Sequence, residues 1–279
     1  MSPAPSLLAR ATRFVRDSWL DWKLDEIARN ERSQLEWARR RDEALYAAKG
    51  DPLVTVTIPT YNRGELLVKR TLPSVFAQTY ANLEIVIVGD GCPDDTPQRI
   101  AALADPRVRF VNLPQRGDYP ADPAKRWMVA GSVPLNETLR LAKGLWISYL
   151  DDDDVYTPDH VEKLLRAAQA EDLELVFGRY RYEKTPGDWR EGNARSFPSG
   201  HPPYRRAGIP HSGVLYRSSL RFFTYYVDAW RYRLPTDNLL WQRMGRAGVR
   251  AGFLDELVCL VPLRPGESAM TIDAVSFTG

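Results

Sequence analysis

The chain has 279 residues, of which 44% are hydrophobic and 27% charged, and its formal net charge is +2. This composition is typical of a folded globular protein with a sizeable core and excludes a disordered chain. The small net charge argues against a nucleic-acid partner, because such a partner calls for a basic stripe on the protein.

The cysteine count and the hydropathy pattern limit the cellular location. Cys92 and Cys259 lie far apart, which excludes a disulfide framework and a zinc site with clustered cysteines and favours a reducing compartment. No uncharged apolar run approaches the ~18 residues that a membrane span needs, and the N-terminus lacks the apolar core of a secretory signal. We therefore expect a cytoplasmic protein.

The first 50 residues form a segment of their own. Residues 6–49 contain no glycine or proline and are rich in Ala, Leu, Arg and Glu, which predicts one or two helices. Arg10, Arg13 and Arg16 occur there with no acid in the first 16 residues. The segment either docks on its own domain or contacts the inner face of a membrane as an amphipathic helix. We expect a helical extension over residues 1–50, ended by the sequence KGDP.

Strands and helices then alternate along the chain. Apolar and β-branched runs at 54–58, 85–88, 108–111 and 145–150 predict strands, and the segments between them have helical spacing. Such alternation implies βαβ units. The predicted fold class is α/β, with a mainly parallel sheet flanked by helices.

The second half is harder to divide. Thr157 is a suitable N-cap and Pro158 a suitable first residue for a helix that buries Val161 and Leu164. We expect further strands at 175–177, 212–216 and 257–261, a helix at 237–244, a long loop at 181–208, and a loosely ordered tail after Pro262.

Polar residues directly follow three of the predicted strands. They are Pro59 to Arg63, Gly89 to Gly91, and Asp151 to Asp154. In an open parallel sheet, ligands bind outside the carboxyl ends of the strands, so these three groups are expected to meet at one edge.

The four consecutive aspartates are costly unless something neutralises them. Two like charges ~4 Å apart repel by about 1 kcal/mol in water and by ~4 kcal/mol at the effective dielectric of a protein rim. A divalent cation removes this cost, and carboxylate oxygens are the ligands that Mg²⁺ and Mn²⁺ prefer. The chain has no GxxxxGK[ST] and no GxGxxG sequence, so metal and side chains are expected to hold any phosphate.

Asp90 and Tyr61 suggest a nucleoside pocket. A carboxylate at a strand end can accept the ring N–H of uracil, thymine or guanine, whereas cytosine offers no such group. Tyr61 can stack on a base. Neither observation is specific by itself.

These residues carry a family resemblance. The stretch VTVTIPTYNRGELLVKRTLPSVFAQTYANLEIVIVGDGCPDDT (54–96), followed by NETLRLAKGLWISYLDDDDVYTPDHVEKLL (136–165), resembles the nucleotide-diphospho-sugar glycosyltransferases of family 2. The match is good over 54–180 and loose to 262. It implies a GT-A (Rossmann-like) domain over 51–262, with a nucleotide-sugar-binding half at 51–154, an acceptor half at 155–262, and a tail at 263–279.

The resemblance also implies roles for individual residues. Asp151 and Asp153 form the D-x-D element that binds Mn²⁺ or Mg²⁺, and Asp152 lies near the donor ribose. The residues expected to line the nucleoside pocket are Pro59, Thr60, Tyr61 and Asp90, with Arg63 in the same region. Many members have two acids where this chain has Gly89 and Asp90, so the base-binding role is assigned to Asp90 alone.

Two further assignments complete the site. The segment 114–131 is longer than usual in the family, and Arg126 within it is our choice for a diphosphate contact, a loop-surface role being the alternative. The sequence PTDNLLWQR (235–243) resembles the element that carries the family's general base, which is then Asp237. The alternative is that Asp237 only caps or charges the start of the helix. Asp255 and Glu256 are rival bases.

We therefore expect a metal-dependent, inverting glycosyltransferase with a nucleoside-diphosphate sugar donor, a UDP-sugar being favoured, and a saccharide or other hydroxyl acceptor. Two other classes stay open. One is a sugar-nucleotide nucleotidyltransferase, which would want a Gly-rich, basic loop after the first strand. The other is a non-catalytic saccharide-binding protein of the same fold.

Overall fold

The computed structural model describes residues 7–48, 50–192 and 208–270, with side chains from Ser18 onward. The helices are α1 (Leu7–Ala47), α2 (Gly64–Leu66), α3 (Leu72–Phe76), α4 (Thr96–Ala101), α5 (Pro123–Val129), α6 (Ser132–Leu141), α7 (His160–Ala170) and α8 (Thr236–Ala247). A π-helical turn, η1 (Leu67–Thr71), joins α2 to α3, and shorter 3₁₀ turns are η2 (His211–Gly213), η3 (Ser218–Phe222) and η4 (Ala229–Tyr232).

The strands form one mixed sheet. They are β1 (Val54–Thr60), β2 (Leu83–Gly89), β3 (Val108–Asn112), β4 (Trp146–Tyr149), β5 (Val155–Tyr156), β6 (Leu175–Thr185), β7 (Asp188–Glu191), β8 (Val214–Arg217) and β9 (Ala251–Val261). The order is β3-β2-β1-β4-β8-β6-β9-β5, with β7 paired to β6. The first four strands are parallel, and β8 joins β4 in the antiparallel direction. The α/β class predicted from the sequence is confirmed.

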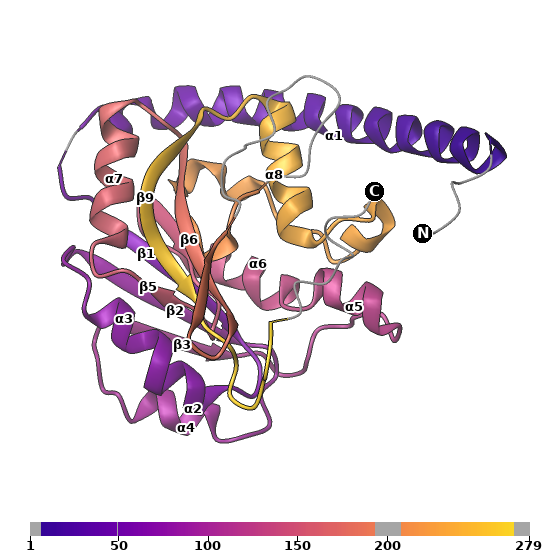
Figure 1. Ribbon diagram of the computed structural model, residues 1–279. Coiled ribbons are helices and arrows are strands. Elements are labelled where there is room, and N and C mark those ends of the chain that lie inside the picture. The colour runs from indigo at the N-terminus through magenta and orange to yellow at the C-terminus, as the bar shows by residue number, and fades with distance from the viewer. Residues whose placement is uncertain (1–6, 49, 193–207, 271–279) are drawn as a thin grey trace.

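Helices cover both faces of the sheet (Figure 1). Val56 and Ile58 of β1 pack with residues of α3 and α7 on one face. Ile147 and Tyr149 of β4 pack with residues of α6 and α8 on the other. Because side chains alternate along a strand, the continuous apolar runs seen in the sequence are those of strands buried on both sides.

α1 is a single long helix that docks along α8 (Figure 1). Its buried positions, Leu24, Ala28, Glu31, Leu35, Ala38 and Asp42, recur every three or four residues and so form one face. Arg243 of α8 is buried and donates to Glu31 at 2.8 Å. The helical extension is therefore part of the described fold from about Leu24 onward, which supports the docking interpretation for that part.

Several boundaries predicted in the second half are wrong. Residues expected in a long loop form the β6–β7 hairpin up to Glu191, while residues 193–207 lie outside the described residues. α7 begins at His160 and not at Pro158, because the Thr157 hydroxyl bonds Asp159 and the Val258 carbonyl instead of capping the helix. The segment expected to be loosely ordered after Pro262 returns over the sheet edge as far as Met270, where its backbone N–H donates to the Lys184 carbonyl at 2.8 Å.

The parallel pairing brings the predicted strand ends together. Thr60 is in register with Gly89, and the Asp90 N–H donates to the Thr60 carbonyl at 2.8 Å. The N–H of Leu150 donates to the Thr57 carbonyl at 3.0 Å, so the aspartates leave the sheet at the same edge.

Candidate active site

The four aspartates form a buried loop at the carboxyl edge of the sheet. Asp152, Asp153 and Asp154 are each 5 to 7% exposed, and they follow the fully buried Leu150. An acidic turn this poorly solvated is not a surface feature, since charges removed from water need neutralising partners. The partners come from distant parts of the chain.

Asp152 and Asp153 are held by the end of β1 and by Arg63. The Thr60 hydroxyl donates to Asp152 at 2.7 Å, and one Arg63 nitrogen donates to Asp152 at 2.8 Å and to Asp153 at 2.9 Å. Burial raises the pKa of Asp152 to about 6. The two oxygens of Asp152 thus connect the acidic loop to Thr60, the last residue of β1, and to Arg63.

Asp151 and Asp154 lie on the other side of this loop and share Ser212. The Ser212 hydroxyl donates to Asp154 at 2.5 Å and accepts the N–H of Asp151 at 3.0 Å. The Tyr149 hydroxyl donates to the Asp151 carboxylate. Burial, followed by the charge of Asp153, raises the pKa of Asp151 to about 6, and burial with the charge of Asp151 raises the pKa of Asp154 well above its usual value.

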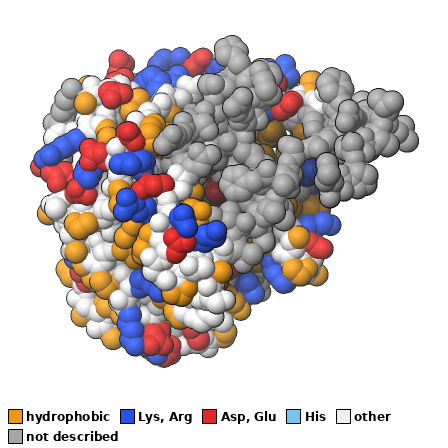
Figure 2. Space-filling view, in the orientation of Figure 1, with side chains coloured by type: hydrophobic (Ala, Val, Ile, Leu, Met, Phe, Trp, Pro, Cys, Tyr) orange, Lys and Arg blue, Asp and Glu red, His pale blue; other side chains and the backbone are white. Residues whose placement is uncertain are grey.

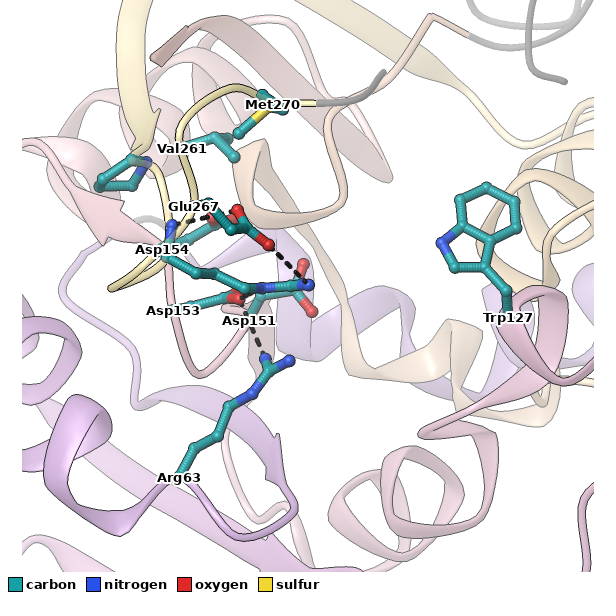
Figure 3. Close-up of a pocket in the computed structure, with 10 residues that line it drawn as sticks. Arg63, Trp127, Asp151, Asp153, Asp154, Val261, Glu267 and Met270 are labelled. Atoms are coloured by element: carbon teal, nitrogen blue, oxygen red, sulfur yellow. Dashed lines mark hydrogen bonds and ion pairs between the residues drawn. The ribbon is translucent and has the colours of Figure 1, made fainter. Parts of the chain in front are cut away.

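The acidic loop opens into a cavity of about 390 Å³ (Figure 3). Figure 3 shows Arg63 reaching the aspartates from one side, while Trp127 of α5 lies across the open space from them. Residues between Val261 and Met270 form another wall of the cavity. The lining residues are Arg63, Trp127, Asp151, Asp153, Asp154, Val261, Pro262, Arg264, Glu267 and Met270.

Asp90, one of the residues predicted to line the nucleoside pocket, is held by residues of the segment 114–131. Asp90 is 2% exposed, accepts the N–H of Gly117 and the hydroxyl of Tyr119 at 2.9 Å each, and lies 4.0 Å from the Arg116 side chain. The Arg116 guanidinium lies 3.9 Å from the centre of the Tyr61 ring. A carboxylate has about four acceptor positions, and these two hydrogen bonds occupy one position on each oxygen of Asp90.

Gly91 permits this arrangement. Its φ is +66°, and a Cβ there would lie 2.4 Å from the backbone nitrogen of Arg116. Only glycine fits such a backbone approach, which explains the glycine directly after Asp90.

Asp237 lies in the first turn of α8, beside an aromatic cluster that also reaches Asp151. His211 stacks on Tyr149 with ring centres 3.4 Å apart, and its Nε2 lies 2.8 Å from the Tyr225 hydroxyl. The charges of Asp237 and Asp151 both raise the pKa of Tyr225, after the larger effect of burial. Burial lowers the pKa of His211 to about 4, with the charge of Asp237 opposing the shift, so His211 is neutral at pH 7.

The remaining predicted residues are placed as follows. Pro59 is buried within β1. Arg126 is on α5 but is not among the residues that line the described cavity, where its neighbour Trp127 is found. Of the rival bases, Asp255 is 81% exposed and pairs with Arg179, and Glu256 pairs with Lys163.

The donor set fits a divalent cation bound with a substrate. Within the described ranges, no three His, Cys, Asp or Glu side chains converge as a complete metal site. Asp152 and Asp153 nevertheless pair with two guanidinium groups, those of Arg63 and Arg264. Burial raises the pKa of Asp151, Asp152 and Asp154, and a divalent cation beside them would favour their ionised forms. Magnesium sites commonly use one or two carboxylates and take the other ligands from phosphates and water.

Four residues of the site were not predicted from the sequence. Ser212 lies 58 residues after its partner Asp154, and Arg264 lies 111 residues after its partner Asp153, so no local pattern links them. Arg116 and Tyr119 lie in the segment 114–131, whose unusual length was the one available clue.

Comparisons with known proteins identify the family of the chain. The model of glycosyl transferase family 2 matches residues 55–121 and 129–234. The succinoglycan biosynthesis protein ExoO of Rhizobium meliloti is 33% identical over 126 residues, which make up 45% of this chain and 32% of that protein. The chain spans between 32% and 60% of the length of three curated relatives that it matches.

Solved structures show the same fold. Residues 1–349 of S. aureus TarS in complex with UDP-GlcNAc match with a TM-score of 0.56 and 17% identity, over 77% of this chain and 60% of that one. The mannosyltransferase PcManGT from Pyrobaculum calidifontis, in complex with GDP-Man and Mn²⁺, matches with a TM-score of 0.57 and 19% identity, over 88% and 70%.

Proposed function

The chain belongs to glycosyl transferase family 2, and on that premise we propose that it transfers a sugar from a nucleoside-diphosphate sugar to a hydroxyl acceptor. The acceptor is a saccharide or another hydroxyl compound, and the reaction serves polysaccharide, glycolipid or other glycoconjugate biosynthesis. One observation carries the proposal: buried carboxylates follow β2 and β4 at the same edge of the sheet, and those that follow β4 line a cavity large enough for a substrate.

The donor half of the reaction is assigned to residues 51–154. Tyr61 and Asp90 recognise the base, and a UDP-sugar is favoured. Pro59 and Thr60 line the nucleoside pocket, while Arg63, Arg126 and Asp152 contact the diphosphate and ribose. The relative that is solved with UDP-GlcNAc and the one solved with GDP-Man support a nucleotide-sugar donor.

Asp151 and Asp153 are proposed to hold Mn²⁺ or Mg²⁺. Such a cation neutralises the charge that develops on the leaving diphosphate. The complex of PcManGT with GDP-Man and Mn²⁺ supports this cofactor. The arginines around the aspartates supply further positive charge to the same cavity.

Asp237, in the half of the domain at 155–262, is proposed as the general base. It takes the proton from the acceptor hydroxyl while that oxygen forms a bond to the anomeric carbon. The bond from this carbon to the diphosphate oxygen breaks on the opposite face, so the configuration inverts. Asp237 is only partly buried in the first turn of α8, so its carboxylate is accessible to an acceptor hydroxyl.

The test is the release of nucleoside diphosphate. Incubating the protein with UDP-, dTDP- and GDP-sugars and Mn²⁺ is expected to release nucleoside diphosphate from one of them, slowly to water and faster with an acceptor, and excess chelator is expected to stop the release. A nucleotidyltransferase would instead consume a nucleoside triphosphate, and a saccharide-binding protein would release nothing. Either of those outcomes would contradict the proposal.

We further propose that the protein is cytoplasmic and contacts the inner face of the membrane through the start of α1. In the part of the chain that the structure describes, no helix has the length and hydropathy to cross a bilayer. Trp19 and Trp22 lie three residues apart on α1 and are each 56% exposed. They follow the basic sequence with Arg10, Arg13 and Arg16. Exposed tryptophans next to basic residues suit an anionic lipid surface.

Vesicle binding tests this contact. The double variant Trp19→Ala/Trp22→Ala is expected to bind vesicles of phosphatidylglycerol and phosphatidylcholine roughly tenfold more weakly than the wild type in co-sedimentation. Trp37→Ala is the matched control, because Trp37 is equally exposed on the same helix but lies beside Arg41 in the docked part. Equal binding by the double variant and the control would argue against a membrane contact.

Figure 2 shows how the charged side chains are distributed over one face of the molecule. Basic and acidic side chains are interspersed over the described residues visible there and form no basic band. That the protein has no nucleic-acid partner stays a prediction from the small net charge of the whole sequence.

A further inference from the structure

The C-terminal segment from Leu263 to Met270, called here the strap, is fastened at both ends. The Leu263 N–H donates to Glu183 at 3.1 Å, and its carbonyl accepts from Arg70 at 2.9 Å. At the other end, the Met270 N–H donates to the Lys184 carbonyl at 2.8 Å. Between these points the chain makes a turn at Arg264 to Glu267. The strap is therefore a defined wall of the cavity.

Arg264 of the strap pairs with Asp153, a carboxylate of the predicted D-x-D element. Arg264 Nε donates to Asp153 Oδ2 at 2.5 Å, and Arg63 donates to the same oxygen at 2.9 Å. Arg264 and Asp153 both line the cavity (Figure 3). One carboxylate oxygen has two principal acceptor positions, so two guanidinium groups saturate Asp153 Oδ2.

The two arginines are not equivalent. Arg63 also donates to Asp152 and its side chain is 35% exposed, so it bridges two buried acids. The Arg264 side chain is 51% exposed, and its other described side-chain contact is Glu267, 3.8 Å away within the strap. When Arg264 leaves Asp153, Arg63 still pairs with that carboxylate, whereas loss of Arg63 would also remove a partner of the buried Asp152.

We infer that Arg264 is a donor-binding residue that pairs with Asp153 in the donor-free protein and moves to the diphosphate of the donor when a divalent cation takes Asp153. The inference rests on the proposed function. A cation and a guanidinium repel each other at one carboxylate oxygen, and a diphosphate offers the planar pair of acceptors that a guanidinium matches best. The strap keeps its backbone fastenings throughout, because only the Arg264 side chain has to turn.

Affinity measurements on Arg264→Ala test the inference, because two affinities are expected to change in opposite directions. Binding of Mn²⁺ alone, followed by the electron paramagnetic resonance of free Mn²⁺, should become about three- to tenfold tighter, since a competing cation is lost from Asp153. Binding of UDP at saturating Mn²⁺, measured by calorimetry, should become about tenfold weaker. A general disturbance of the site would weaken both.

Two further variants sharpen the test. Arg264→Lys keeps the charge but not the planar fork, so its Mn²⁺ affinity should stay near that of the wild type while UDP binding still falls severalfold. Arg190→Ala is the control, because Arg190 forms a surface pair with Asp188 in the β6–β7 hairpin and does not line the cavity. It should change neither affinity.

The results of these experiments separate a failure of the Arg264 inference from a failure of the proposed function. If the wild type binds Mn²⁺ and UDP but Arg264→Ala changes neither affinity, or weakens both, the role of Arg264 is refuted and the proposed function stands. If the wild type binds neither Mn²⁺ nor UDP, dTDP or GDP, the proposed function and this inference are both refuted.

Discussion

Asp237→Asn is expected to lower the rate of sugar transfer by about 10²- to 10⁴-fold while the affinity for nucleoside diphosphate stays unchanged. The amide has the shape of the carboxylate but cannot take the acceptor proton, and the cavity that holds the acidic loop does not include Asp237 among its described lining residues. The measurements are the turnover rate with the active donor and the Kd for the matching diphosphate.

The loss of Asp237 is not expected to unfold α8. A negative charge in the first turn of a helix contributes about 0.3 to 1 kcal/mol, so the melting temperature should fall only slightly. Asp255→Asn is the matched control, because Asp255 is an exposed rival base paired with Arg179. Full turnover in Asp237→Asn, or a comparable loss in Asp255→Asn, would show that the base has been assigned wrongly.

Asp153→Asn should abolish metal-dependent donor binding. The substitution removes a carboxylate oxygen that a divalent cation would need, and it leaves Arg264 without its charged partner on the acidic loop. For the wild type, a nucleoside diphosphate at 100 times its Kd stabilises the native state by about 2.7 kcal/mol. A thermal-shift series with UDP, dTDP and GDP, with and without Mn²⁺, measures this stabilisation.

The control for this variant is Asp159→Asn. Asp159 lies six residues further along and pairs with Lys163, away from the cavity lining. It should keep the metal-dependent shift. Persistence of that shift in Asp153→Asn would mean that the D-x-D assignment is incorrect.

The parallel half of the fold could be predicted because its signals are local. Val54 to Ile58 and Ile85 to Val88 are continuous apolar or β-branched runs, and each matches a buried strand. The β6–β7 hairpin could not be predicted in this way. Its residues are half-exposed and charged, so its pairing depends on contacts across the hairpin and with β9 and not on a hydrophobic period.

The residues of the candidate site fall into the same two groups, those with a local sequence signal and those without one. Residues that directly follow strands, such as Thr60, Asp90 and Asp153, were found because the carboxyl edge of a parallel sheet is a predictable place for ligands. Arg264 was not found, since it belongs to a segment with no periodic pattern and contacts Asp153 from 111 positions away.

The sequence by itself determined that a buried apolar run is followed by four acids and that polar residues follow two other strands, because burial is carried by local patterns of side chains. The tertiary structure decided how those acids are neutralised. Ser212, Arg63 and Arg264 reach them from three separate segments, and a charge in a buried loop is stable only when such partners arrive from outside its own segment. The pairing of Arg264 with Asp153, which no local pattern indicates, is what points to its role in donor binding.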